Sequence, residues 1–271
     1  ITVDDQVSSG NSTGVAGFNR GSGSNVINVS NAEGNAIVLA GGTGIYGYNR
    51  SSATSLSIVG NMVYGYGGNG IRARNYGSLG TDVTVTNSVG TGQVFGDDIG
   101  IDARNQYESL FIVADNVTGA NQDGIRAYNS NTGDVLSITV FGDVTGGNDG
   151  IQAANYGIGS TSIIASNIDG TSTVTGANNG INAYSDSSTT TTNVAANTVT
   201  GTNANGIIAN HRGTGGLRVS ALNGDGTATA TGDTNGIFAY NTNGGALTVL
   251  ANNARGINGY GIYAYSDGVA G

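Results

Sequence analysis

Short runs in which apolar and polar residues alternate recur along the whole chain. Examples are VLSITV at 135–140, LFIV at 110–113 and LSIV at 56–59, and Gly, Asn, Asp, Ser or Thr separate such runs. Alternation with a period of two, over three to six residues rich in Val, Ile and Thr, is typical of β-strands. Asn and Asp prefer turns to helix interiors. The pattern therefore predicts an all-β protein.

The same hexapeptide, Gly-[Ile/Val]-x-[Ala/Gly]-x-[Asn/Ser], opens one run after another. Its ten copies follow one another at intervals of 24 to 30 residues and begin at Gly14, Gly44, Gly70, Gly100, Gly124, Gly150, Gly180, Gly206, Gly236 and Gly261. Asn210-His211 is the copy that breaks the final Asn/Ser position. Each interval contains two further short apolar runs. Three strands and three turns per interval indicate one coil of a parallel β-solenoid.

We therefore expect residues 1–271 to form a single domain, a right-handed parallel β-helix with three sides and about ten coils of 24–30 residues. Parallel crossover connections are right-handed almost without exception. Coils stacked about 4.8 Å apart would make a rod about 48 Å long.

Because side chains alternate along a strand, each position of the hexapeptide is predicted to point either into the coil or outward. The Ile or Val and the Ala or Gly should point inward, and the Asn falls where the chain turns. Stacked Asn side chains can bond to one another and to the turn backbone. We expect such an asparagine ladder at Asn19, Asn49, Asn75, Asn105, Asn129, Asn155 and Asn241. Asn or Asp directly before the motif glycine, as at Asp123-Gly124, predicts positive φ at that corner.

Longer coils carry their extra residues at one place. Those that begin at Gly14, Gly70, Gly150 and Gly206 have additional residues between the second and third strands, including Gly34-Asn35, Gly90-Thr91-Gly92, 169–171 and 223–226. One corner of the rod should therefore project in these four coils.

Composition narrows the function classes. The chain has 49 Gly, no Cys, Pro or Trp, nine basic residues that are all Arg, and a net charge of −9. This balance argues against a nucleic-acid partner, which needs a basic surface. No apolar run reaches 18 residues, so we expect no membrane span in this chain.

The outward positions of the hexapeptide gather Tyr and Arg on one face. Flat aromatic and guanidinium groups in columns can stack on sugar rings or on a neighbouring rod. Tyr also has high β-propensity, so a purely structural role is the alternative. The predicted contact surface comprises Tyr46, Tyr48, Arg72, Arg74, Arg104, Arg126, Tyr128, Tyr184, Tyr240, Tyr263 and Tyr265.

The stretches GIRAYNSNTGDVLSITVFGDVTG and GIYAYSDG resemble the repeat-rich passenger regions of bacterial autotransporters and related surface adhesins. The resemblance extends over nearly the whole chain and implies an extracellular or cell-surface right-handed β-helix. We therefore expect a structural or adhesive solenoid, a surface stalk or filament subunit, and no enzyme. Its expected partners are like chains stacked head to tail or flanking repeats of a longer chain, and surface glycans.

The alternative is a carbohydrate-active β-helix enzyme. Asp97-Asp98 after Gly96 resembles an acidic motif of polygalacturonases, and His211-Arg212-Gly213 resembles their His-Gly element. The two elements lie about four coils, or ~20 Å, apart, and the chain has no Lys for the Arg-x-Lys element. Three Asp on adjacent coils of one face would favour the enzyme. We expect no catalytic residue and interpret His211 as a replacement for a ladder Asn.

Metal and ice binding are the remaining alternatives. We expect no metal site and no cofactor, although sixteen Asp leave structural calcium open, since hard cations prefer clustered oxygens. Thr-rich stretches raise ice binding, but most coils lack Thr-x-Thr in register.

Overall fold

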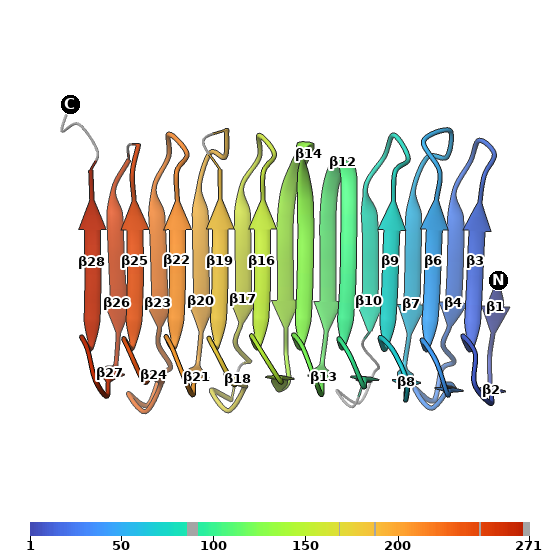
Figure 1. Cartoon of the computed structure of the whole chain (residues 1–271), viewed down its shortest axis with the longest axis horizontal. Coiled ribbons are helices and arrows are strands. Elements are labelled where there is room, and N and C mark those ends of the chain that lie inside the picture. Colours follow the sequence, from blue (N-terminus) through green and yellow to red (C-terminus); the bar gives the residue numbers. More distant parts are fainter. Residues whose placement is uncertain (86–91, 168, 187, 244, 268–271) are drawn as a thin grey trace.

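The computed structural model describes residues 1–85, 92–167, 169–186, 188–243 and 245–267. These residues form 28 strands and no helix, and thus no helix that could cross a membrane. The strands stack in parallel as coils of a solenoid of about ten turns (Figure 1). The expected parallel β-helix is confirmed.

Each coil contributes one strand to each of three walls, and every pair of neighbouring strands is parallel. Wall 1 carries the hexapeptides and consists of β3 (Val15–Asn19), β6 (Ile45–Asn49), β9 (Ile71–Asn75), the first part of β12 (Ile101–Ala114), the first part of β14 (Ile125–Val140), β16 (Ile151–Asn155), β19 (Ile181–Ser185), β22 (Ile207–His211), β25 (Ile237–Asn241) and β28 (Ile262–Ser266). Wall 2 follows it in the chain and consists of β1 (Thr2–Val3), β4 (Asn25–Val29), β7 (Leu56–Gly60), β10 (Thr81–Val85), the last parts of β12 and β14, β17 (Thr161–Ala165), β20 (Thr192–Ala196), β23 (Leu217–Ala221) and β26 (Leu247–Ala251).

Wall 3 closes each coil and leads to the next hexapeptide. It is a ten-stranded sheet of its own, whereas β12 and β14 join walls 1 and 2 into one sheet. Wall 3 consists of β2 (Gln6–Ser9), β5 (Ile37–Ala40), β8 (Met62–Gly65), β11 (Gln93–Gly96), β13 (Asn116–Gly119), β15 (Val144–Gly146), β18 (Thr173–Gly176), β21 (Thr198–Gly201), β24 (Thr229–Gly232) and β27 (Asn253–Gly256).

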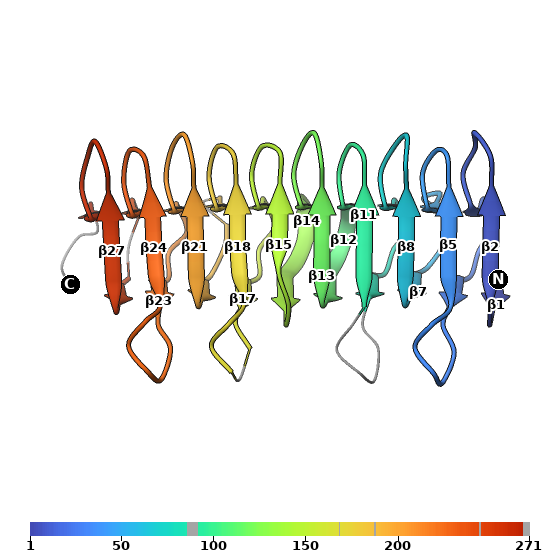
Figure 2. The ribbon, with the colours of Figure 1, turned by 90° about the horizontal axis from the view of Figure 1, so that it is seen from below.

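The path of one coil shows the hand of the solenoid. In Figure 1 the strands of wall 1 run up the front and those of wall 2 run down the back, and Figure 2 shows wall 3 returning from back to front below. Meanwhile the chain advances from the N-terminal end on the right to the C-terminal end on the left. The coil is right-handed, as expected for parallel crossovers.

The hexapeptides lie in register and their inward residues form a continuous core. Ile101 of β12 pairs with Ile71 of β9 and with Ile125 of β14, and Ala103 lies between Ala73 and Ala127 in the same way. The first inward position is fully buried in the eight coils from Ile45 to Ile237. Its residues there are Ile45, Ile71, Ile101, Ile125, Ile151, Ile181, Ile207 and Ile237.

The small second inward position lets walls 1 and 2 approach closely. A Cβ built on Gly47 would lie 2.8 Å from Leu56 Cδ1 and 2.9 Å from Ile58 Cδ1 on wall 2. These distances are shorter than van der Waals contact, so a larger side chain would push the walls apart. Burial of such columns is the main stabilising contribution of each coil.

The expectation of positive φ at the motif glycines is wrong. Among the described residues, positive φ occurs at Gly23, Gly34, Gly170, Gly226 and Glu108. The motif glycines are required by close packing instead: a Cβ on Gly124 would lie 2.6 Å from the carbonyl oxygen of Gly150 and 2.6 Å from Val144 Cγ1. Because the backbone of the next coil and a valine of wall 3 lie so close, the Cα of this glycine can carry a hydrogen atom but no side chain.

In the described part of the chain, the longer coils that begin at Gly14, Gly150 and Gly206 project between walls 2 and 3, as expected (Figure 2). Three of the loops share one design, in which a leading Asn accepts a hydrogen bond from a backbone N–H four or five residues later and a Gly takes positive φ. The bonds are Asn35 N to Asn31 Oδ1, Thr171 N to Asn167 Oδ1 and Ala228 N to Asn223 Oδ1. The loop between β10 and β11, with Gly90-Thr91, lies largely outside the described residues.

Candidate contact surface

The outer face of wall 1 carries three aromatic clusters along the rod. Neighbouring ring centroids within them lie 5.1 to 6.5 Å apart. The amino-terminal cluster consists of Phe18, Tyr46, Tyr48 and Tyr76; the central cluster of Tyr128, Tyr156 and Tyr184; and the carboxyl-terminal cluster of Phe238, Tyr240, Tyr260, Tyr263 and Tyr265. The seven Tyr predicted for this surface all belong to these clusters.

Equal positions on successive coils place rings on top of one another. Tyr240 stacks on Tyr265 with 5.1 Å between centroids and 13° between planes, and Phe238 stacks on Tyr263 at 5.1 Å and 8°. The coil rise of about 4.8 Å fixes this spacing.

Arginines lie between the amino-terminal and central clusters, each in a different environment. The guanidinium of Arg72 lies over the Tyr46 ring, 5.4 Å from its centroid. Arg126 donates from Nε to Asp123 Oδ2 at 2.6 Å and from Nη2 to Gln122 Oε1 at 2.7 Å. The Arg104 side chain is 52% exposed, and its nearest acidic atom is Asp102 Oδ1 at 3.8 Å.

Arg74 does not belong to the exposed surface, which corrects the sequence prediction. It occupies an outward position, but the residue is only 6% exposed and forms an ion pair with Asp102, itself 4% exposed. Its guanidinium also donates to the backbone oxygens of Ala73 and Asp102, at 3.0 and 2.9 Å. Arg74 therefore joins two coils and is not available to a partner.

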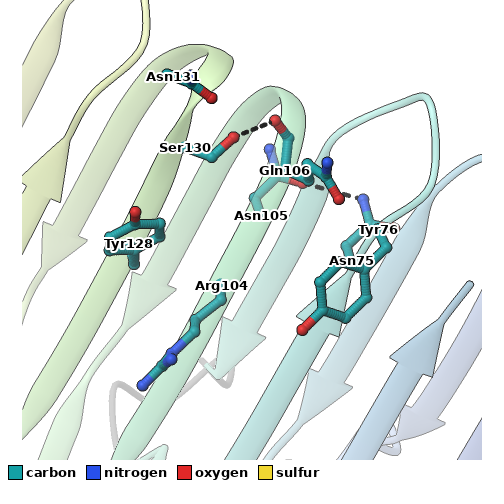
Figure 3. A pocket seen from close by; sticks show the side chains of 8 residues that line it. All are labelled: Asn75, Tyr76, Arg104, Asn105, Gln106, Tyr128, Ser130 and Asn131. Atoms are coloured by element: carbon teal, nitrogen blue, oxygen red, sulfur yellow. Dashed lines mark hydrogen bonds between the residues drawn. The ribbon is translucent and has the colours of Figure 1, made fainter. Parts of the chain in front are cut away.

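A depression lies across the coils of β9, β12 and β14, with Arg104 between Tyr76 and Tyr128 (Figure 3). Its volume is about 470 Å³. Tyr76 and Tyr128 are 42% and 39% exposed. The residues that line it are Asn75, Tyr76, Arg104, Asn105, Gln106, Tyr128, Ser130 and Asn131.

Two further depressions lie on the same wall. One, of about 340 Å³, shares Arg104 and Tyr128 with the first and continues it to Tyr156. The other, of about 300 Å³, lies near the amino-terminal end and is lined by Phe18, Arg20, Tyr46, Tyr48 and Arg50. The outer face of wall 1 is thus hollowed repeatedly, and each hollow combines Tyr with Arg.

Sequence analysis missed Tyr76 and Tyr156, which directly follow a ladder Asn. The signal was present, because the outward alternation continues one step beyond the hexapeptide. A second aromatic group, Tyr64, Tyr66 and Phe95, was also missed and lies on wall 3, where Tyr64 stacks on Tyr66 with 6.0 Å between centroids.

The predicted asparagine ladder runs inside the turn from wall 1 to wall 2. Each Nδ2 donates to the Oδ1 one coil later: Asn49 to Asn75 at 3.1 Å, Asn75 to Asn105 at 3.0 Å, Asn105 to Asn129 at 3.1 Å and Asn129 to Asn155 at 3.4 Å. Asn19 and Asn241 donate to the backbone of their own turns, at Gly23 and Gly245. The ladder from Asn49 to Asn155 is structural, since its amides are buried and bonded to one another.

His211 takes a ladder position, as interpreted from the sequence. It pairs with Ser185 on one side and Asn241 on the other, and its Nδ1 lies 2.8 Å from Thr192 Oγ1. The residue is fully buried. Burial lowers the pKa of His211 below its ordinary value, and the backbone of Gly215 opposes part of this shift.

A second ladder, which the sequence analysis missed, occupies the turn from wall 3 to wall 1. The residue before the motif glycine accepts a bond from the backbone N–H of its counterpart one coil later: Asp149 N to Asp123 Oδ1 at 3.1 Å, Asn179 N to Asp149 Oδ1 at 3.0 Å and Asn205 N to Asn179 Oδ1 at 3.1 Å. Asp123 and Asp149 are buried. Their carboxylates hold the corner together.

The elements that resembled polygalacturonase motifs are not brought together. Asp97 and Asp98 lie in the turn from wall 3 to wall 1, and Asp98 accepts a bond from Gln122 Nε2 of the next coil. His211 lies in the other turn of wall 1, four coils away. Among the described residues, no three His, Asp or Glu are grouped as a metal site would require.

Threonines of wall 3 lie in register on three adjacent coils. Thr173 pairs with Thr198, Thr175 with Thr200 and Thr200 with Thr231. The remaining coils of wall 3 lack the Thr-x-Thr pair.

Comparison of the chain with models of protein families gives no match, and searches of curated proteins and of solved structures give none either.

Proposed function

We propose that the chain is a stiff extracellular or cell-surface rod, structural and adhesive rather than enzymatic, that holds its partner on the outer face of wall 1. In-register backbone bonds along three walls resist bending, and wall 1 offers the contacts. The resemblance of the repeat to autotransporter passenger regions supports the location.

One observation supports this proposal: polar side chains in the turns of wall 1 bond to neighbouring coils, whereas those on its outer face are open to solvent. Asn and Asp at the two turns of wall 1 bond to neighbouring coils. Arg104, Tyr76 and Tyr128 instead face a depression that is open to solvent. Partly exposed Tyr and Arg in one patch are the side chains that dominate protein contact surfaces.

The in-register stacking of the coils supports a second contact. Strand β28 pairs in parallel with β25, and its inward Ile262 lies in register with Ile237. An open parallel edge accepts another strand. We propose that a further coil pairs there, from a like chain stacked head to tail or from flanking repeats of the same chain.

Binding by wild type and a Tyr48→Ala/Tyr128→Ala variant tests the role of wall 1. Both would be presented with immobilised polysaccharides and with cell surfaces, and Tyr66→Ala on wall 3 is the matched aromatic control. We expect the double variant to lose binding and the control to keep it. Equal binding by all three proteins would reject wall 1 as the contact surface.

Negative-stain images at rising protein concentration test stacking. Head-to-tail association predicts filaments with an axial repeat near ten coil rises, about 48 Å. A constant monomer mass in light scattering would eliminate stacking of like chains.

A further inference from the structure

The arginines are concentrated along one part of the rod. Seven of the nine Arg lie on wall 1 or in its turn to wall 2: Arg20, Arg50, Arg72, Arg74, Arg104, Arg126 and Arg212. The turns between walls 2 and 3 hold seven acidic residues and, in the described part of the chain, no Arg: Asp4, Asp5, Glu33, Asp115, Asp143, Asp169 and Asp225. Wall 1 and its turn to wall 2 also hold five acidic residues, Asp102, Glu108, Asp134, Asp186 and Asp267. Arg therefore exceeds acid there by two in a chain of net charge −9, and this local excess favours an anionic partner.

Arg104 on the outer face of wall 1 is open to an external anion. Its nearest acidic atom, Asp102 Oδ1, is 3.8 Å from Nε, and Asp102 is already paired with Arg74. Half of the Arg104 side chain is exposed. A planar guanidinium with free donors matches a carboxylate, which it can bind through two parallel hydrogen bonds.

The two rings beside Arg104 favour a sugar chain as the carrier of that anion. Tyr76 and Tyr128 lie on the coils before and after Arg104, so two coil rises, about 10 Å, separate their positions along the rod. Exposed ring faces pack against apolar faces of sugar rings. Gln106, Ser130 and Asn131 line the same depression and supply polar groups for sugar hydroxyls.

We infer that the Tyr76–Arg104–Tyr128 depression binds a polysaccharide that carries carboxylate groups, with a carboxylate on Arg104 and sugar rings against Tyr76 and Tyr128. This inference rests on the proposed role of wall 1 as a contact surface. The chain of the polysaccharide lies along the rod, because the adjoining depression continues from Tyr128 to Tyr156. A neutral sugar chain would leave the Arg104 donors without a charged acceptor.

Calorimetric titration with polygalacturonate and with its methyl ester tests the inference, because the two polymers share a backbone and differ in charge. We expect binding of the acid, at least about tenfold weaker binding of the ester, and weakening of the acid complex by added salt. Arg104→Gln should weaken binding of the acid about tenfold. Arg218→Gln removes an exposed Arg from wall 2 and should leave the affinity unchanged.

Three results would overturn the inference. The first is equal affinity of the protein for polygalacturonate and for its methyl ester. The second is an equal change in affinity in Arg104→Gln and Arg218→Gln. The third is that folded wild-type protein, as judged by its melting transition, binds neither polymer. If one of these results is obtained while the Tyr48→Ala/Tyr128→Ala variant loses binding to a different partner, the inference fails but the proposed function is retained. Release of reducing ends during the titration would contradict the non-enzymatic role.

Discussion

Tyr128 and Asn129 are neighbours on β14, yet they belong to two regions that follow different rules. The inward Asn129 is fully buried and bonds to the ladder amides of the coils on either side. The outward Tyr128 is 39% exposed, contacts Tyr156 and faces a depression. Each strand of wall 1 therefore builds a structural ladder with one set of alternate residues and a contact surface with the other.

The difference is visible in how freely the positions vary from coil to coil. The ladder position holds Asn, Ser or His, each of which can bond along the stack. The two outward positions range from Arg and Tyr to Ile, Asn and Ala. Bonding to the next coil restricts the inward position, whereas solvent admits many side chains outside. The ladder should therefore govern stability, and the outer face should govern binding.

Arg74 and Asp102 break this comparison and give the largest expected effect. Both occupy outward positions, but both are buried and paired. Asp102→Ala would leave the Arg74 charge buried without its partner and should lower the free energy of unfolding by about 3–5 kcal/mol. Chemical denaturation of wild type and variant measures the change.

The double variant Arg74→Met/Asp102→Leu is the control for that experiment. It removes both charges and retains apolar volume, so it should be less destabilised than Asp102→Ala alone. A change below about 1 kcal/mol in Asp102→Ala would show that the pair is in effect solvated.

Asn105→Ala tests the inward side of the comparison. Asn105 Oδ1 accepts from Asn75 and from Thr81 Oγ1, and its Nδ2 donates to Asn129. Loss of these buried bonds should cost about 2–3 kcal/mol of unfolding free energy. The matched control, Asn131→Ala, removes an exposed Asn two residues from the ladder and should change stability by less than about 0.5 kcal/mol. Equal effects of the two variants would deny the ladder its structural role.

The repeat made most of the fold predictable. Hexapeptides of one pattern at intervals of 24–30 residues fix the register, because each Ile must lie over the Ile of the preceding coil. The asparagine ladder and the projecting loops follow from the same register. The reason why glycine is required at the motif positions could not be predicted from the register. It depends on how closely walls 1 and 3 approach, as the contacts of Gly124 with Gly150 and Val144 show.

The candidate site was less predictable, because exposure depends on neighbours from other coils. Arg74 and Arg104 occupy the same motif position, but Asp102 pairs with Arg74 and leaves Arg104 exposed. The depression also needs Tyr76, which lies beyond the hexapeptide, next to Tyr128 of another coil. A single repeat does not contain this combination.

His211 makes the ladder sensitive to pH. Burial lowers its pKa in the folded state, so the unfolded chain binds a proton first as the pH falls through the ordinary value of about 6.5. Stability should therefore decrease between pH 7.5 and 5.5, with a slope of at most about 1.4 kcal/mol per pH unit. Denaturation of wild type and His211→Asn over this range measures the effect. A slope that persists in His211→Asn would assign the proton to another group.

Tyr48→Ala/Tyr128→Ala should have the smallest effect on stability and therefore sharpens the comparison most. Both rings lie on the outer face, where each aromatic neighbour contributes roughly 0.2–1 kcal/mol. The inward columns of the same strands stay unchanged, so melting should shift by only a few degrees. Binding should nevertheless be lost, because both rings line depressions of wall 1. Destabilisation as large as that of Asn105→Ala would mean that the outer rings also hold the coils together. Inward residues would then not be the main source of stability, and outward residues would not serve binding alone.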